Sequence, residues 1–161
     1  MCALVTSRLD SSNCLLVGLQ EDKIKKLQVV QNDAARVNVQ ANYNDHITET
    51  RKSLHWLPIR ERLDYKVALF VYKALHGEAP SYIEDLITIY VPPRSLRSSN
   101  KYLLKPPESR PHLVYYGYRA FEHYAPSIWN SLGSEVRASN TTSDFKSKLK
   151  TFLFKRCYES G

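Results

Sequence analysis

The sequence contains few cysteines and few glycines, and each shortage excludes a class of protein. The 161 residues include three Cys and five Gly. An odd number of cysteines, Cys2, Cys14 and Cys157, spread towards the two ends of the chain, does not form a disulfide framework and favours a reducing compartment. The chain has no Gly-Lys-Ser/Thr sequence and no Gly-x-Ser-x-Gly sequence, which excludes a phosphate-binding P-loop and the nucleophile turn of a hydrolase.

Long apolar runs are also absent. No stretch approaches the ~18 consecutive apolar residues that a membrane-spanning helix requires. The first residues carry Arg8 and Asp10 where a signal peptide would have its apolar segment. We therefore expect an intracellular protein of the nucleus or cytoplasm, neither secreted nor bound to a membrane.

Residues that would carry out catalysis are missing as well. The five histidines and three cysteines occur at none of the short paired spacings that zinc ligands use. Two-metal nucleotidyl transfer needs carboxylates that share the ions, often as adjacent aspartates. The nearest pairs here are Glu21-Asp22 and Glu84-Asp85, which we interpret as capping or surface acids. We expect no catalytic residue, no metal, no cofactor and no small-molecule substrate, and hence no enzyme.

The net charge of +7 is concentrated in one half of the chain. Residues 1–90 contain eleven Lys and Arg and eleven Asp and Glu, whereas residues 91–161 contain twelve Lys and Arg and only five acids. A surface of this kind attracts polyanions, because each neutralised phosphate releases condensed counterions. A solvated basic surface without a partner explains the same composition equally well.

Hydrophobic spacing predicts helices over residues 1–90. A stripe of Ile24, Leu27, Val30, Ala34 and Val37 predicts a helix that starts at Glu21. A second helix is expected over Ile59–Leu75, apolar almost all round near its end and therefore central, and Gly77 ends it. Shorter helices are predicted over Leu9–Leu19, Ile47–Trp56 and Pro80–Ile87.

Residues 91–161 differ in character, with two proline pairs that bracket a Ser/Arg loop at 94–100. The segments Tyr102–Leu104 and His112–Tyr118 favour a small β-hairpin. A helix is expected over Ala120–Leu132, and a final amphipathic helix begins at a capping-box-like Thr141-x-x-Asp144 and buries Phe145, Leu149, Phe152 and Leu153. The predicted fold is mainly α: a helical bundle over 1–90 and a basic extension over 91–161.

The basic extension also holds eleven of the eighteen aromatic residues. Rings beside cations can stack on bases while the cations hold phosphates. We expect Phe121, Trp129, Phe145 and Phe152 to be core residues, whereas the tyrosines near 116 are as consistent with a binding surface as with the core. The candidate nucleic-acid-binding residues are Arg94, Arg97, Lys101, Lys105, Arg110, Tyr116, Tyr118 and Arg119.

Several ordered blocks resemble one known family. They include Lys26-Leu-Gln28-x-x-Gln31-Asn32, Leu54-His-Trp-Leu-Pro58, Tyr72-Lys-Ala-Leu75-x-Gly77, and Ala125-Pro126-x-x-Trp129-Asn-Ser-Leu132. Together they resemble the thumb-like C-terminal region that follows the polymerase core in LINE-type (non-LTR) retrotransposon reverse transcriptases, over nearly the whole chain.

This resemblance implies a fragment without catalytic residues, because the family's catalytic Asp pair lies in the palm and its endonuclease lies further upstream. It implies a module that contacts the backbone of RNA or DNA, with the polymerase core as a further partner. The alternative is a helical protein-interaction fragment, or a translated relic with no nucleic-acid role. An exposed apolar patch on the 1–90 bundle would favour that alternative.

Overall fold

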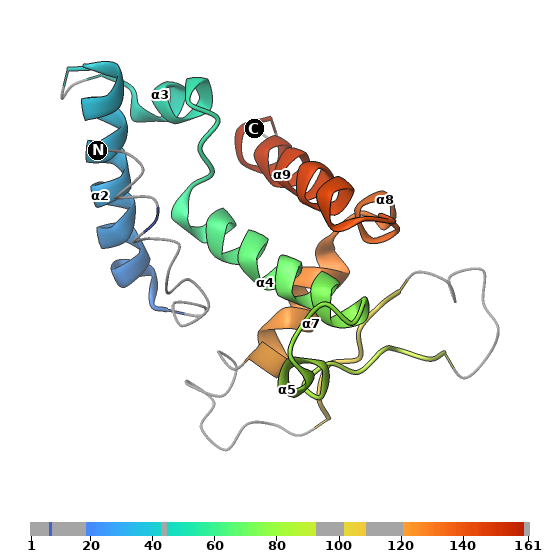
Figure 1. The fold of residues 1–161 in the computed structure, drawn as a ribbon. Coiled ribbons are helices and arrows are strands. Elements are labelled where there is room, and N and C mark those ends of the chain that lie inside the picture. Colours follow the sequence, from blue (N-terminus) through green and yellow to red (C-terminus); the bar gives the residue numbers. More distant parts are fainter. Residues whose placement is uncertain (1–6, 8–18, 43–44, 93–101, 109–120, 160–161) are drawn as a thin grey trace. The chain divides into compact units, whose positions relative to one another are not determined.

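The computed structural model describes residues 7, 19–42, 45–92, 102–108 and 121–159. Seven helices and no sheet occur over these residues (Figure 1). They are α2 (Glu21–Val39), α3 (Ile47–Ser53), α4 (Ile59–Leu75), α5 (Ser81–Glu84), α7 (Phe121–Ser131), α8 (Ser134–Arg137) and α9 (Thr142–Tyr158). The predicted mainly α fold is therefore confirmed. None of the described helices is both long enough and apolar enough to cross a bilayer.

The chain divides into two compact units. Unit 1 takes its described residues from 7–64 and 153–159, and unit 2 from 65–152. The first turns of α4 thus belong to unit 1 and the rest of α4 to unit 2, while α9 is divided after Phe152. The predicted boundary after residue 90 lies inside unit 2.

The core of unit 1 joins the start of α2 to the start of α4. Ile24 packs with Ile59 and Leu63, and Leu19 and Leu27 cover this cluster. Glu21 and Asp22 occupy the first turn of α2, where acids interact favourably with the helix dipole. Arg60 forms an ion pair with Glu21 across the same pair of helices.

The buried face of α2 differs from the predicted stripe. Ile24 is buried, but Val30 and Val37 are 51% and 62% exposed, while Gln31 and Ala35 are fully buried. Hydrogen bonds explain this orientation of the helix, since Gln31 Nε2 donates to the Leu57 carbonyl over 2.9 Å.

A neighbouring glutamine completes this contact. Gln28 Oε1 accepts the backbone N–H of Ile59 over 2.9 Å, and Gln28 Nε2 donates to Gln31 Oε1 over 2.8 Å. Ile59 is the first residue of α4, so its N–H has no partner within the helix. The two glutamines of α2 therefore hold the N-terminus of α4. Because these contacts are polar, the spacing of apolar residues did not predict them.

α3 ends three residues before the predicted end at Trp56. The Trp56 N–H donates to the Arg51 carbonyl and the His55 N–H to the Lys52 carbonyl, the pattern of a Schellman motif, with His55 in the left-handed region at φ 54°. The His55 ring then stacks on Phe154, with 5.7 Å between centroids.

The C-terminal turn of α9 is held to the same unit by two polar contacts. Arg156 Nη2 donates to Asp64 Oδ2 over 2.6 Å, and Asp64 is only 4% exposed. The Tyr158 hydroxyl donates to the Trp56 carbonyl over 2.8 Å. Both contacts join residues about a hundred positions apart in sequence and fix the end of the chain in unit 1.

Unit 2 has an aromatic core. Tyr72 of α4 stacks on Phe145 of α9, and Phe145 in turn lies 5.8 Å from the Trp129 ring of α7. All three side chains are at most 1% exposed. The Tyr72 hydroxyl donates to the Ser139 carbonyl over 3.0 Å, which satisfies its polar end in the core. The predicted core roles of Trp129 and Phe145 are confirmed, whereas Phe121 and Phe152 are half-buried.

Local signals located the ends of two helices in this unit. α4 has the predicted bounds and is followed by Gly77, whose φ of +66° only glycine adopts without strain. α9 starts beside Thr141, whose Oγ1 accepts the Asp144 N–H over 3.2 Å, as the predicted cap requires. α7 contains Pro126 within its first two turns.

The predicted hairpin is only partly within the described residues. Its second segment, His112–Tyr118, lies outside them. Within the first segment, Leu104 forms an isolated antiparallel bridge with Ile89. The Asn130 side chain binds both the N–H and the carbonyl of Leu104, over 2.9 Å each, and so fixes this segment to α7.

Candidate nucleic-acid interface

Most of the predicted site lies outside the described residues. Those outside are Arg94, Arg97, Lys101, Arg110, Tyr116, Tyr118 and Arg119. Lys105 is the one candidate within them, directly after the bridge between Leu104 and Ile89.

Lys105 has acidic neighbours. Its ammonium forms an ion pair with Glu108, and this hydrogen bond and charge hold the pKa of the Glu108 carboxyl below its usual range. Lys105 also borders a cavity of about 210 Å³ lined by Asp85, Glu108 and Glu122. A phosphate that binds Lys105 competes with these carboxylates, so this lysine is a weaker phosphate ligand than an unpaired one.

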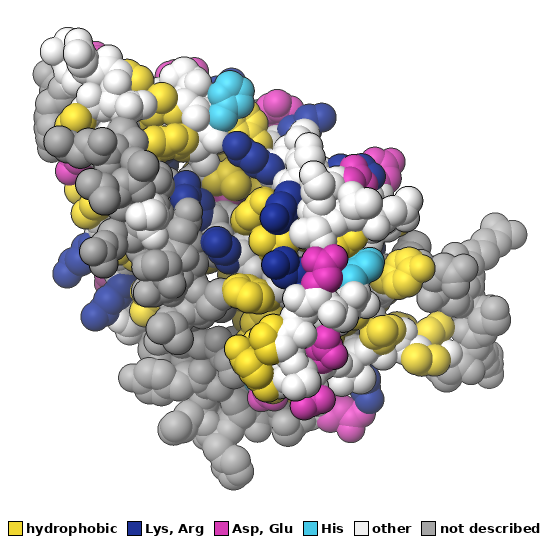
Figure 2. Space-filling model, viewed as in Figure 1, with side chains coloured by type: hydrophobic (Ala, Val, Ile, Leu, Met, Phe, Trp, Pro, Cys, Tyr) yellow, Lys and Arg dark blue, Asp and Glu magenta, His cyan; other side chains and the backbone are white. Residues whose placement is uncertain are grey.

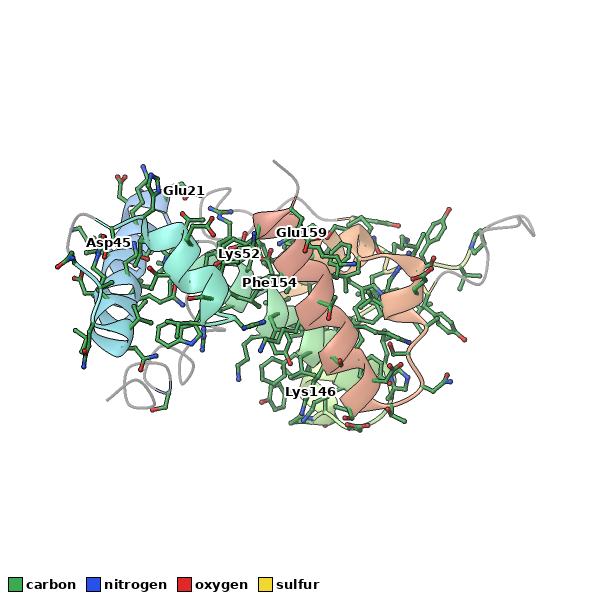
Figure 3. All side chains as sticks on the ribbon, turned by 90° about the horizontal axis from the view of Figure 1, so that it is seen from above. Glu21, Asp45, Lys52, Lys146, Phe154 and Glu159 are labelled. Atoms are coloured by element: carbon green, nitrogen blue, oxygen red, sulfur yellow. The ribbon has the colours of Figure 1, made fainter. Side chains whose placement is uncertain are left out.

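The described lysines of α9 offer a second basic surface. Lys146, which Figure 3 labels on α9, and Lys150 are both exposed. They are four residues apart, so they are neighbours on one flank of the helix. Lys148 lies on the other flank and is paired with Asp144 over 2.7 Å. Because Phe145 and Leu149 are fully buried, the helix holds Lys146 and Lys150 at the surface of unit 2. Figure 2 shows such basic side chains on the described surface, interspersed with apolar and acidic ones.

Unit 2 also exposes three tyrosines that are not among the predicted nucleic-acid-binding residues. Tyr82, Tyr90 and Tyr102 are 66%, 42% and 60% exposed. Tyr82 follows Pro80 and Tyr90 precedes two prolines, and such surroundings are typical of surface segments. Proximity to proline was therefore an available signal for Tyr82 and Tyr90, but not for Tyr102.

A larger cavity, of about 490 Å³, lies within unit 2. Its wall includes His76, Tyr102, Trp129, Arg137 and Asn140. Arg137 is only 7% exposed, and its Nε and Nη1 atoms are buried without a hydrogen-bond partner. This burial lowers the pKa of Arg137. No sequence signal distinguishes Arg137 from the other basic residues, since its burial depends on how α8 packs.

Metal ligands do not gather in the described part of the chain. No group of three His, Cys, Asp or Glu side chains lies close enough there to hold an ion. The Cys157 thiol is half-buried, and this burial together with the nearby Glu61 raises its pKa to about 12. A protonated thiol is a poor nucleophile and a poor metal ligand.

Comparisons with known proteins give no relative. No protein-family model matches the chain. No curated protein and no solved structure is significantly similar to it.

Proposed function

We propose that the chain is a non-enzymatic module that binds the backbone of RNA or DNA. The observation that carries the proposal is the charge distribution, with twelve Lys and Arg against five acids over residues 91–161 and none of this excess over residues 1–90. Backbone phosphates are the polyanions that such a surface binds best. The exposed Lys146 and Lys150 and the exposed rings of unit 2 add cations and stacking surfaces of the kind that single-stranded nucleic acids use.

The finer proposal is that this module corresponds to the thumb-like C-terminal region of a LINE-type reverse transcriptase. The ordered blocks of the sequence support it. Three residues of these blocks have structural roles here, because Gln28 and Gln31 join α2 to α4 and Trp129 lies in the core of unit 2. The predicted loop residues Arg94, Arg97 and Lys101 remain the proposed phosphate ligands.

The direct test is the salt dependence of binding, measured by fluorescence anisotropy. Labelled single-stranded RNA, single-stranded DNA and duplex are titrated with the full chain across a salt series. We expect a steep fall of affinity with log salt. The triple variant Arg94→Ala/Arg97→Ala/Lys101→Ala should reduce the slope by about 2, since each lost phosphate contact removes roughly 0.7 from the slope on a single strand.

A matched control removes the same charge elsewhere. Lys23, Lys25 and Lys26 are exposed on α2, in the half of the chain that has no net charge. The triple variant Lys23→Ala/Lys25→Ala/Lys26→Ala should keep the wild-type salt slope. Equal slopes for wild type and the loop variant would contradict the assignment of the loop.

A second candidate function is favoured by a specific observation on α2. Val29, Val30 and Val37 are 55%, 51% and 62% exposed on this helix. Val30 and Val37 are seven residues apart and therefore lie on one face of α2, and an exposed apolar helix face suits contact with another protein. For this function, we expect Val30→Ser/Val37→Ser to abolish binding to a LINE-type polymerase core in a pull-down, without any change in RNA affinity.

A further inference from the structure

Arg137 is the last residue of α8. The residue is 7% exposed, and its Nε and Nη1 atoms are buried without a hydrogen-bond partner among the described residues. A guanidinium remains charged in proteins, and a buried charge is stable only when it is paired. No carboxylate among the described residues forms an ion pair with Arg137. Among the described residues, Arg137 therefore has no anionic partner.

The cavity beside Arg137 has room for an anion. Its volume of about 490 Å³ falls within the ~300–1,000 Å³ of small-ligand sites, so it suits one small molecule rather than a length of strand. None of the residues that line it is Asp or Glu. The smaller cavity beside Lys105 is the opposite case, because three carboxylates line it. These two cavities thus differ in the sign of charge they accept.

The rest of the wall suits a flat ring. Tyr102 lines the cavity with a side chain that is 60% exposed, and Trp129 Nε1 holds the Tyr102 carbonyl over 2.6 Å. This bond and the adjacent bridge of Leu104 to Ile89 keep Tyr102 in the left-handed region at φ 48°. Ile89 and Leu75 add apolar surface. An aromatic ring next to a buried cation matches a ligand with a planar group and an oxyanion.

We propose that this cavity binds one nucleotide, with its phosphate on Arg137 and its base against Tyr102. The nucleotide is either free or part of a strand. If the nucleotide is part of a strand, the inference deepens the proposed nucleic-acid function and rests on it. If the nucleotide is free, the inference does not depend on that function.

The first experiment measures ligand-induced stabilisation of the full chain. Thermal unfolding is followed with millimolar adenosine monophosphate, inorganic phosphate or adenosine, and affinities are measured by calorimetry. Adenosine monophosphate should raise the Tm most, and phosphate alone less, because a ligand stabilises the state that binds it. Absence of any shift with adenosine monophosphate and with phosphate would overturn the proposal.

The variants separate a binding role from a structural one. Arg137→Met keeps the length of the side chain and removes the charge, and should weaken adenosine monophosphate and phosphate at least about tenfold, the usual scale for a lost charge-assisted contact. The same variant should have an equal or higher Tm without ligand, because replacing a buried unpaired charge by an apolar side chain is neutral or stabilising. A fall in Tm with unchanged ligand affinity would assign Arg137 to the structure and reject the site.

Two further variants serve as controls. Tyr102→Ala keeps the backbone carbonyl that Trp129 binds, and should weaken adenosine monophosphate while leaving phosphate affinity unchanged. Lys23→Met removes one positive charge from exposed α2 and should leave both affinities unchanged. Equal loss of affinity in Lys23→Met and Arg137→Met would mean a diffuse charge effect and contradict a defined site.

Competition separates the two sources of the nucleotide. If the ligand is part of a strand, adenosine monophosphate should displace a short labelled RNA, and Arg137→Met should weaken that RNA. If the ligand is a free nucleotide, adenosine monophosphate should bind without displacing RNA. Binding of long RNA with the full salt slope but no binding of adenosine monophosphate would reject this cavity and leave the proposed function standing.

Discussion

At the scale of single residues, buried polar side chains determine how α2 is oriented in unit 1. Gln31 has no exposed surface and binds the Leu57 carbonyl, and Gln28 binds the first N–H of α4. A helix of different orientation would bury Val30 instead, and would leave the Leu57 carbonyl and the Ile59 N–H without partners. Since an unpaired buried group costs more than a valine gains by partial burial, the glutamines decide the orientation.

The substitution Gln31→Ala should destabilise the chain. The substitution leaves the Leu57 carbonyl without its donor and should lower the free energy of unfolding by about 1–3 kcal/mol. Urea denaturation followed by circular dichroism measures the change. Asn38→Ala, on the exposed side of the same helix, should change stability by less than about 0.5 kcal/mol. Equal effects of the two substitutions would contradict the role assigned to Gln31.

The Cys157 thiol gives a prediction about pH. Its pKa rises from 9.0 in a model compound to about 12 in the folded protein, through burial and then the charge of Glu61. The folded state therefore holds the proton more tightly, so this group's contribution to stability is complete below pH 9 and is lost as the pH rises towards 12. Chain stability should fall over this range, and Cys157→Ala should reduce that fall.

Alkylation measures the same property directly. In a Cys2→Ser/Cys14→Ser background, iodoacetamide at pH 8 should modify native Cys157 at least about tenfold more slowly than the urea-unfolded chain, because the thiolate is the reacting species. Equal rates in the folded and unfolded chains would show that the thiol is neither buried nor shifted.

At the scale of secondary-structure elements, helix ends differ in how well their residues suit them. Gly77 follows the C-terminus of α4 with φ +66°, whereas Gln40 follows the C-terminus of α2 with φ 53°. Both positions are left-handed, a conformation that costs a residue with a Cβ atom roughly 1–2 kcal/mol. Glycine is thus well suited to the position after α4, whereas the backbone of Gln40 is strained at the position after α2.

Opposite substitutions at these two ends should have opposite effects. Gly77→Ala should destabilise the chain by about 1 kcal/mol, although no atom would lie within 4 Å of the new Cβ. Gln40→Gly should stabilise the chain by up to a similar amount, since Gln40 is exposed. Thermal unfolding of the two variants beside the wild type measures both changes. Shifts of the same sign would contradict the argument from φ.

At the scale of the whole molecule, the basic side chains differ in whether acidic neighbours pair with them. Lys105 lies among carboxylates and Arg156 is paired with Asp64, whereas Lys146 and Lys150 are exposed on α9. Net charge steers a polyanion towards the chain, but only cations without competing acids hold its phosphates closely. The lysines of α9 are therefore expected to add to the contacts of the loop at 94–101.

This expectation is tested by Lys146→Ala/Lys150→Ala. The double variant should reduce the salt slope of single-stranded RNA binding by about 1–1.5, in proportion to two lost phosphate contacts. Lys23→Ala/Lys25→Ala carries the same change of charge and should keep the wild-type slope. The salt series of fluorescence anisotropy measures both variants, and a slope that falls only in the α2 variant would place the interface on the other half of the chain.

Local chemistry made several features predictable from sequence. Apolar spacing and Gly77 identified α4 with its observed bounds, and Thr141 with Asp144 located the start of α9. These signals act within a few residues of where they stand, so their effect does not depend on the rest of the fold. Net charge and its uneven distribution are likewise properties of the sequence alone.

Tertiary structure decided what depends on residues far apart in the chain. The buried face of α2 follows from a bond between Gln31 and Leu57, which are 26 positions apart. Leu104 pairs with Ile89 because Asn130 of α7 holds its backbone. Burial of Arg137 without a partner, and the cavity in front of it, arise only when α4, α7 and α8 pack together. Periodicity describes each helix by itself, whereas burial of a polar group is a property of the assembled unit.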